Sequence, residues 1–322
     1  MKLQILVPHY KESAEVLKPL LDSVAIQQNV DMNEIGVIIV HDGTDFLELG
    51  EYPYTIKQIK AEHQGVSATR NRALDEAEAD YVMFCDCDDM FFNACGLWII
   101  FREMKDGFDA LVSVFTEETR TPDGDVMYIN RDMDSTFVHG KVYRREYLQT
   151  QNIRFNPTLT IHEDSYFNCL AQKCSENVKY CPSPFYLWKW RDESVCRHDP
   201  KYILKTYNNM LESNTALVNE LLNREKVSDA QFYSTAMIYD AYFTMNKAEW
   251  INQENKEYRR KTELRFKKYF SEFKDLFNSI PEQSKAQIIV SIKNRFYQEG
   301  LLMESITFDD WIKHIEAMEG ET

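Results

Sequence analysis

The segment YVMFCDCDDMF, residues 81–91, places three carboxylates directly after a short apolar run. Residues 81–86 have the composition of a buried strand. Asp86, Asp88 and Asp89 then repel one another, more strongly where water is excluded, unless protons, open water or a cation relieve the repulsion. A cation would indicate a function, because one or two carboxylates commonly hold Mg²⁺ or Mn²⁺ where phosphate is handled. Acidic turns also follow strands in ordinary solvated loops, so the surrounding sequence has to decide.

The surrounding sequence predicts an α/β fold. Residues 1 to about 115 alternate β-branched runs with helical patterns, which is typical of β-α-β units and of a Rossmann-like, mostly parallel sheet flanked by helices. The predicted strands are 3–8, 35–43, 54–61 and 81–86, and the predicted helices are 13–28 and 66–79.

Three of the predicted strands end in polar residues. These are His9 and Tyr10, His41 and Asp42, and the acidic loop 86–89. In open α/β sheets, ligands bind outside the carboxyl ends of the strands. We therefore expect the three strand ends to meet at one crevice.

The charge balance argues against a protein that wraps nucleic acid over a general basic surface. The chain has 322 residues, with 37 Lys and Arg against 52 Asp and Glu, for a formal charge of −15. The N-terminal apolar run is broken at Pro8, and no later stretch has the length of a membrane span. Seven cysteines without regular spacing favour a reducing compartment, so the sequence predicts a cytoplasmic protein. Cys85 and Cys87 are read as small strand residues rather than zinc ligands.

From about residue 200 the pattern becomes mostly helical. The predicted domains are therefore 1–199, an α/β catalytic domain, and 200–322, a helical domain. Within the second, residues 256–277 are locally basic and carry aromatic side chains at helical spacing. This pattern suits peripheral contact with anionic lipid at the inner face of a membrane, or a polyanionic acceptor. The simpler interpretation, which we favour, is a surface helix whose aromatic face packs in the core.

Six motifs in matching order give the chain a family resemblance. They are VPHYKE (7–12), IIVHDGTD (38–45), HQGVSATRNRAL (63–74), YVMFCDCDD (81–89), HGKVYRREYL with IRFNPTLTIHEDSYFN (139–148 and 153–168), and YLWKWRDESV (186–195). With these motifs, residues 1 to about 198 resemble family 2 glycosyltransferases of the GT-A fold, especially the bacterial and phage type that builds surface polysaccharides. The resemblance implies a metal-dependent inverting enzyme that moves a sugar from a nucleotide diphosphate sugar, with a UDP-sugar as first choice, to a hydroxyl acceptor.

The resemblance assigns a nucleotide pocket. Pro8, Tyr10 and Glu12 would line it, Asp42 would accept hydrogen bonds from the base, and Arg70 would lie beside the base or its phosphates. A carboxylate can accept from the imide N–H of uracil, and a guanidinium suits phosphate or a flat ring. The alternatives are a turn-capping Asp42 and a surface arginine. His41 stands where the family often has an acid, which leaves the nucleobase less determined.

The resemblance also assigns a cation site for Mn²⁺ or Mg²⁺. Asp88 would be the principal ligand, and Asp86 would bind directly or through water or sugar hydroxyls, while Asp89 is left out of the set. His198 is a candidate third ligand, with an ordinary loop residue as the alternative. Arg191, together with Ser194, would fold over the diphosphate.

Asp164 is the implied catalytic base. It would take a proton from the acceptor hydroxyl on the face opposite the departing diphosphate, which predicts inversion. Glu163 would position Asp164 or contact the acceptor, although both acids would also suit the start of a helix. Trp188 and Trp190 would stack on a sugar or pack in the core.

Several alternatives remain open on the sequence. A phosphatase of the haloacid dehalogenase type also ends a strand in Asp-x-Asp, but Met90 stands where that motif has Thr or Val. A nucleotidyltransferase would have a glycine-rich phosphate loop near the first strand, which VPHYKESAE lacks. The other two are a sugar-nucleotide-binding module without turnover and a phage-type enzyme that glycosylates a hydroxylated DNA base. A glycan or lipid-linked glycan is the first choice of acceptor.

Overall fold

A computed structural model describes residues 1–132, 134, 136–192, 202–298 and 306–320 of the chain. The chain divides into two compact units, Met1–Ser194 and Val195–Thr322. The predicted boundary between residues 199 and 200 lies in the segment 193–201, outside the described residues.

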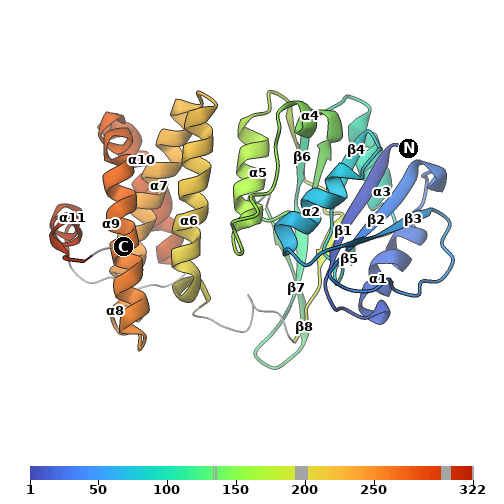
Figure 1. Cartoon of the computed structure of the whole chain (residues 1–322), viewed down its shortest axis with the longest axis horizontal. Helices are drawn as coiled ribbons and strands as arrows, with labels where there is room; N and C mark the ends of the chain where they lie inside the picture. Colours follow the sequence, from blue (N-terminus) through green and yellow to red (C-terminus); the bar gives the residue numbers. More distant parts are fainter. Residues whose placement is uncertain (133, 135, 193–201, 299–305, 321–322) are drawn as a thin grey trace. The chain divides into compact units, whose positions relative to one another are not determined.

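A seven-stranded sheet forms the centre of the first unit, in the order β10-β6-β9-β4-β1-β2-β3 (Figure 1). Its strands are β1 (Leu3–His9), β2 (Ile35–Asp42), β3 (Thr55–Ala61), β4 (Tyr81–Phe84), β6 (Ala110–Ser113), β9 (Lys141–Arg144) and β10 (Val178–Cys181). All neighbours pair in parallel except β9, which is antiparallel to both β4 and β6. The prediction of a mostly parallel sheet is confirmed, and each of the four predicted strands is present.

Helices cover both faces of this sheet. They are α1 (Ala14–Ala25), α2 (Val66–Asp75), α3 (Gly96–Met104), α4 (Arg145–Thr150) and α5 (Glu163–Lys173), with a 3-10 turn, η1 (Met32–Glu34), before β2. Ile5 and Val7 of β1 share one buried cluster with Leu20 of α1 and Ile100 of α3. On the other face, Phe84 meets Phe167 of α5 edge to face. Alternation along buried strands thus sends successive side chains to opposite helix layers.

A second, four-stranded sheet lies beside the acidic loop, in the order β5-β11-β7-β8. Its strands are β5 (Met90–Phe91), β11 (Tyr186–Trp188), β7 (Phe115–Arg120) and β8 (Val126–Arg131). β5 begins directly after Asp89, and Tyr186 pairs with Phe91 across the sheet. This pairing carries a segment about a hundred residues later in the chain to the acidic loop.

The second unit is helical. Its helices are α6 (Tyr202–Asn223), α7 (Val227–Met245), α8 (Ala248–Ile251), α9 (Lys256–Ser279), α10 (Glu282–Gln298) and α11 (Phe308–Ala317). The aromatic face of α9 lies in the core of this unit: Phe266, Tyr269, Phe270, Phe273 and Phe277 are all buried. These rings are therefore not a surface for lipid. Among the helices that the structure describes, none is long and apolar enough to cross a bilayer.

The basic side of α9 meets the end of the chain. Arg260 donates to the carbonyl of Glu319, Lys267 donates to the carbonyl of Met318, and Lys274 pairs with Glu316 at 2.7 Å. Part of the predicted basic surface is thus used within the unit. Peripheral membrane contact through residues 256–277 stays a prediction that would rest on the remaining exposed lysines.

Candidate active site

The polar ends of β1, β2 and β4 meet at one cavity of about 330 Å³, together with the start of α2. Its lining residues are Pro8, His9, Tyr10, Glu12, Asp42, His63, Gly65, Val66, Thr69, Arg70, Asp86, Cys87 and Asp88. The predicted crevice is therefore present. Asp164 and Arg191 are not in the lining of this cavity, and His198 and Ser194 lie outside the described residues.

Asp42 both lines the cavity and fixes the loop that precedes α2. Its Oδ1 accepts the backbone N–H of Gln64 at 2.8 Å, and its Oδ2 accepts that of Gly65 at 3.0 Å. Nδ1 of His63 lies 2.9 Å from the same Oδ2. His63 in turn stacks on Tyr10, with ring centroids 4.6 Å apart. The turn-capping role is thus real, and it holds a pair of stacked rings at the wall of the cavity.

Arg70 is buried, so the alternative of a surface arginine is wrong. Its Nη1 donates to Glu163 at 2.8 Å and its Nη2 to Asp86 at 2.9 Å, while the guanidinium lies 5.2 Å from the ring centre of Phe155. Burial alone would lower the pKa of Arg70, but the two carboxylates outweigh it and raise the pKa. The side chain is a permanent cation that joins α2, α5 and the acidic loop.

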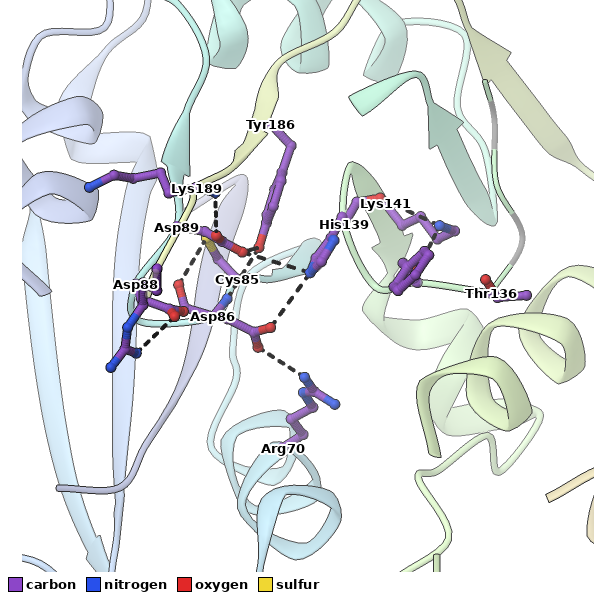
Figure 2. A network of polar contacts seen from close by, with 12 residues as sticks. Arg70, Cys85, Asp86, Asp88, Asp89, Thr136, His139, Lys141, Tyr186 and Lys189 are labelled. Carbon is purple, nitrogen blue, oxygen red and sulfur yellow. Dashed lines mark hydrogen bonds and ion pairs between the residues drawn. The ribbon is translucent and has the colours of Figure 1, made fainter. Parts of the chain in front are cut away.

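Asp86 lines the cavity, and its partners are buried side chains. Besides Arg70, it meets His139, whose Nε2 lies 3.6 Å from Oδ2 of Asp86 and 3.7 Å from Oδ2 of Asp89 (Figure 2). Burial would raise the pKa of Asp86, but Arg70 and His139 outweigh it, so that the pKa lies below its usual range. One ligand atom each from Asp86, Asp89 and His139 lie within 4.8 Å of one another, a spacing that a metal ion fits.

Asp89 is held as a buried side chain. It accepts hydrogen bonds from the hydroxyl of Tyr186 and, at 2.9 Å, from the backbone N–H of Lys189 (Figure 2). Burial, and then the charges of Asp88 and Asp86, raise its pKa well above the ordinary value. These contacts tie the acidic loop to β11 and explain why the residue is buried.

His139 was not predicted as part of the site. It is buried between two aromatic rings, stacking on Tyr186 at 4.9 Å and on Phe137 at 5.4 Å. Gly140 follows with φ at +66°, and a Cβ there would lie 2.8 Å from the hydroxyl of Ser113, so the turn requires glycine. The sequence signal for this turn is the pair His-Gly directly before β9.

Lys141 supports the same turn from inside the fold. This buried lysine donates to the backbone carbonyl of Phe137, and Figure 2 shows it beyond His139, on the side away from the acidic loop. Burial lowers its pKa to about 8, against the opposing influence of Asp134 and Asp164.

Asp88 pairs with Arg191. Its Oδ2 lies 2.8 Å from Nη1 of Arg191, which is also 4.0 Å from Oε1 of Glu12. The hydrogen bond that Arg191 donates to Asp88 raises the pKa of Arg191. This pair links the acidic loop and the segment after β11, which were expected to handle diphosphate, to the turn after β1, which was expected to line the nucleotide pocket.

Asp164 stands in the first turn of α5, where the sequence predicted a helix start. Its Oδ1 accepts the backbone N–H of Ser165 at 2.8 Å. Burial, followed by the charge of Glu163, raises its pKa to about 7, against the lowering influence of Arg70. A carboxyl with this pKa can accept a proton near neutral pH. The neighbouring Glu163 pairs with Arg70, which lines the cavity.

The two tryptophans have different surroundings. Trp188 is half-buried in an aromatic group, 5.3 Å from Phe137 and 5.1 Å from His139 between ring centres. Trp190 donates from its indole N–H to Asp192 at 2.9 Å. Trp188 therefore takes part in packing beside the acidic loop, as the second of its two predicted roles requires.

The sequence model of the protein family described as glycosyl transferase family 2 matches residues 4–170, which is more than half of the chain. The chain belongs to glycosyl transferase family 2. The resemblance drawn from the six motifs is thereby confirmed.

Curated family 2 relatives are bacterial. EpsH of Bacillus subtilis is 24% identical over 225 residues, covering 60% of this chain and 63% of that protein. TarS of Staphylococcus aureus, named a poly(ribitol-phosphate) β-N-acetylglucosaminyltransferase, is 26% identical over 213 residues, covering 60% of this chain and 36% of that protein. The chain thus spans less than two thirds of the length of the curated relatives it matches.

Solved structures of S. aureus TarS 1-349 share the fold of this family 2 chain. The complex with UDP matches with a TM-score of 0.63 at 16% identity and covers 93% of this chain and 92% of that one. The complex with UDP-GlcNAc matches with a TM-score of 0.57 at 19% identity over the same shares. At this identity the likeness establishes the fold, and the predicted GT-A architecture with a helical C-terminal region is confirmed.

Proposed function

We propose that this family 2 chain is a metal-dependent inverting glycosyltransferase that moves a sugar from a UDP-sugar to a glycan hydroxyl. The observation that supports it best is the meeting of Asp42, Arg70, Asp86 and Asp88 around one cavity in a GT-A fold. The volume of about 330 Å³ is within the usual range for a small-molecule site, about 300–1,000 Å³.

The nucleoside would bind at the wall made by β1, β2 and the loop before α2. Stacked Tyr10 and His63 offer a flat aromatic face there. Asp42 has two oxygens with several acceptor sites, so it can accept a base N–H in addition to the N–H groups of its own loop. Uridine remains the first choice, which agrees with the solved complexes of TarS with UDP and UDP-GlcNAc.

Mn²⁺ or Mg²⁺ would bind at the acidic loop. Asp86 and Asp88 line the cavity, whereas Asp89 does not and already accepts two hydrogen bonds. We therefore assign Asp86 and Asp88 as ligands and treat Asp89 with His139 as the competing set. A hard cation bound there would stabilise the negative charge that develops on the departing diphosphate.

The protein side chains would divide the remaining work. Asp164 would take the proton of the acceptor hydroxyl. The acceptor oxygen would form the new bond to the anomeric carbon as the bond between that carbon and the diphosphate breaks. The pKa of Asp164, about 7, suits that role near neutral pH. Arg70 would hold Glu163 beside this base, and Arg191 would exchange Asp88 for diphosphate when the donor binds.

The acceptor would be a growing surface polysaccharide or a lipid-linked glycan. This assignment rests on the relatives, which include TarS, a transferase acting on poly(ribitol-phosphate) by its name. A DNA acceptor has no observation in its favour beyond the basic stretch of α9.

A donor hydrolysis and transfer assay tests the proposal. Purified protein with Mn²⁺ is expected to release UDP slowly from UDP-GlcNAc or another UDP-sugar, and faster when an acceptor glycan is added. Asp88→Ala should abolish release, while Asp164→Asn should keep part of the hydrolysis and lose transfer. Transfer at the wild-type rate by Asp164→Asn would show that another group is the base.

A further inference from the structure

His9 and His41 lie side by side at the ends of two neighbouring strands, and His41 stands where the family often has an acid. His9 closes β1 and His41 lies opposite it in β2, and both are buried, at 2% and 0% exposure. Their Nδ1 atoms are 2.9 Å apart, which is a hydrogen bond and requires one proton between them. His9 also lines the donor cavity.

The outer nitrogen of His41 must carry a proton. It lies 2.8 Å from Oε1 of Gln58. Leu47 sets the orientation of that amide. Its backbone N–H donates to Oε1 of Gln58 at 3.0 Å, and its carbonyl accepts from Nε2 of Gln58 at 3.1 Å. The oxygen therefore faces His41 and can only accept, so that Nε2 of His41 is a donor.

The outer nitrogen of His9 must carry a proton as well. It lies 2.7 Å from the backbone carbonyl of Glu12, which only accepts. Three contacts therefore need three protons on two rings. Two neutral imidazoles supply only two, so the pair holds one additional proton and one positive charge.

We propose that His9 and His41 form a shared monocation that holds the turn 9–12 in the shape that binds the sugar nucleotide. They are positioning residues, since His9 acts through the Glu12 carbonyl and His41 acts through His9. The inference rests on the proposed function for its ligand, but the proton count itself does not. Burial is the largest cause that lowers the pKa of His41, which favours a neutral His41 ring.

The turn needs this support because its backbone is strained. Lys11 has φ at +66°, a left-handed conformation that residues other than glycine rarely adopt. Two contacts close the turn: His9 donates to the carbonyl of Glu12, and Glu12 Oε2 accepts the N–H of Tyr10 at 2.9 Å. Without the third proton, two lone pairs face each other at hydrogen-bond distance, and one contact must open.

The nearby charged groups either oppose a charge on the histidine pair or are paired with other residues. The additional proton is therefore held mainly by the hydrogen bonds of the two rings. Lys60 of β3 acts against a charge on His41, although Asp45 pairs with that lysine at 2.6 Å. The hydroxyl of Thr44 lies 3.3 Å from Nδ1 of His9. Asp42, which follows His41, is already paired with His63, and Glu12 faces Arg191 at 4.0 Å.

The consequence is a pH dependence of donor binding. A group that must be protonated to hold the binding shape works fully at low pH and fails as pH rises through its deprotonation. Affinity for a UDP-sugar should then fall by about tenfold for each pH unit above that point, the slope for one linked proton.

The proton count is tested directly by ¹⁵N spectra of the histidine rings in the whole protein at pH 7. Both ring nitrogens of His9 should show N–H shifts, and His41 should show one N–H and one bare nitrogen. Ring-to-backbone correlations assign the rings in the wild type, so the result does not depend on a variant that folds. One bare nitrogen in each ring would overturn the proposal.

The role in binding is tested with UDP-GlcNAc, whose diphosphate does not titrate near neutral pH, between pH 6.5 and 8.5. In His9→Gln the amide N–H can still donate to Glu12 but cannot titrate, so the affinity of this variant should vary less with pH than that of the wild type. His314→Gln, at an exposed position of α11, is the matched control and should keep the wild-type profile. Equal profiles in wild type and His9→Gln would overturn the positioning role. Absence of UDP-GlcNAc binding at every pH would instead contradict the proposed function, and the ring spectra would still decide the proton count.

Discussion

Asp86 and Asp88 are neighbours on one loop, yet they lie in different surroundings. Asp86, whose side chain is 32% exposed, is held at 2.9 Å by Arg70, a side chain with only 5% exposure that is joined to Glu163 as well. Asp88 is held by Arg191, and these two side chains are 28% and 31% exposed. The two carboxylates are thus similarly exposed and differ in their partners: the inner ion pair, Asp86 with Arg70, has a buried cation, and the outer ion pair, Asp88 with Arg191, has an accessible one. A ligand can replace the outer ion pair at little cost, whereas the inner one belongs to the fold.

Substitution of the two arginines should give the largest effect and tests whether the two ion pairs differ in their contribution to stability. Arg70→Met leaves Asp86 and Glu163 without their buried partner, and we expect a loss of about 3–5 kcal/mol in the free energy of unfolding. Arg191→Met removes only a partly exposed partner and should cost less than about 1 kcal/mol. Urea unfolding of both variants measures the difference. Equal losses would mean that the inner and outer ion pairs do not differ as described.

Removal of the outer carboxylate should act on chemistry rather than on stability. Asp88→Asn is expected to lower the transfer rate by about 10²–10³-fold, the size of effect seen when one stabilising group for developing charge is lost. Its unfolding free energy should stay within about 0.5 kcal/mol of the wild type. Mn²⁺ binding followed by electron paramagnetic resonance should weaken in parallel.

The matched control for that experiment is His139→Asn. If Asp86 and Asp88 hold the cation, this variant binds Mn²⁺ as the wild type does. Loss of Mn²⁺ binding in His139→Asn, with Asp88→Asn unaffected, would move the cation to the set formed by Asp86, Asp89 and His139.

The rate of transfer should depend on pH through Asp164. A base with a pKa of about 7 is active when deprotonated, so the rate should fall about tenfold per pH unit below 7 and level off above it. Because this pKa is raised on folding, the same group favours the folded state when protonated, and that contribution is lost as pH rises through 7. A rate profile from pH 5 to 8 checks it. The residual donor hydrolysis of Asp164→Asn should show no acidic limb of this origin.

The stacked pair at the nucleoside wall should give the smallest effect. Tyr10→Ala removes one aromatic face, worth about 0.5–1.5 kcal/mol, which corresponds to a loss of about two- to tenfold in affinity for UDP. Calorimetry with UDP measures it. Tyr10→Phe keeps the ring and serves as the control that should bind as the wild type does.

Local patterns were sufficient to predict the frame of the site. Apolar runs bounded by helical patterns fix the strands, and parallel strands bring their carboxyl ends to one edge, so the meeting of Asp42 with Asp86 and Asp88 followed from the sequence. The start of a helix at Glu163 was also predictable from a local pattern, because acidic residues are favourable in the first turn of a helix.

The inner network depends on contacts that no local pattern encodes. His139 reaches the acidic loop because β9 enters the sheet between β4 and β6, antiparallel to both. Arg70 lies in a polar helix whose composition predicts exposure. It is buried where it pairs with Glu163 of α5, which comes 93 residues later in the chain. The ring protons of His9 and His41 likewise depend on Gln58 and on the carbonyl of Glu12, which the fold brings to the two rings.

Calorimetric titration with UDP-GlcNAc, in Mn²⁺ and then in chelator, tests the central claim most directly. The cavity at the acidic loop should bind the nucleotide sugar in Mn²⁺, more weakly by at least about tenfold in chelator, and Asp88→Asn should bind equally weakly in both. Equal binding by the wild type with and without the cation, or no binding in either, would contradict the account.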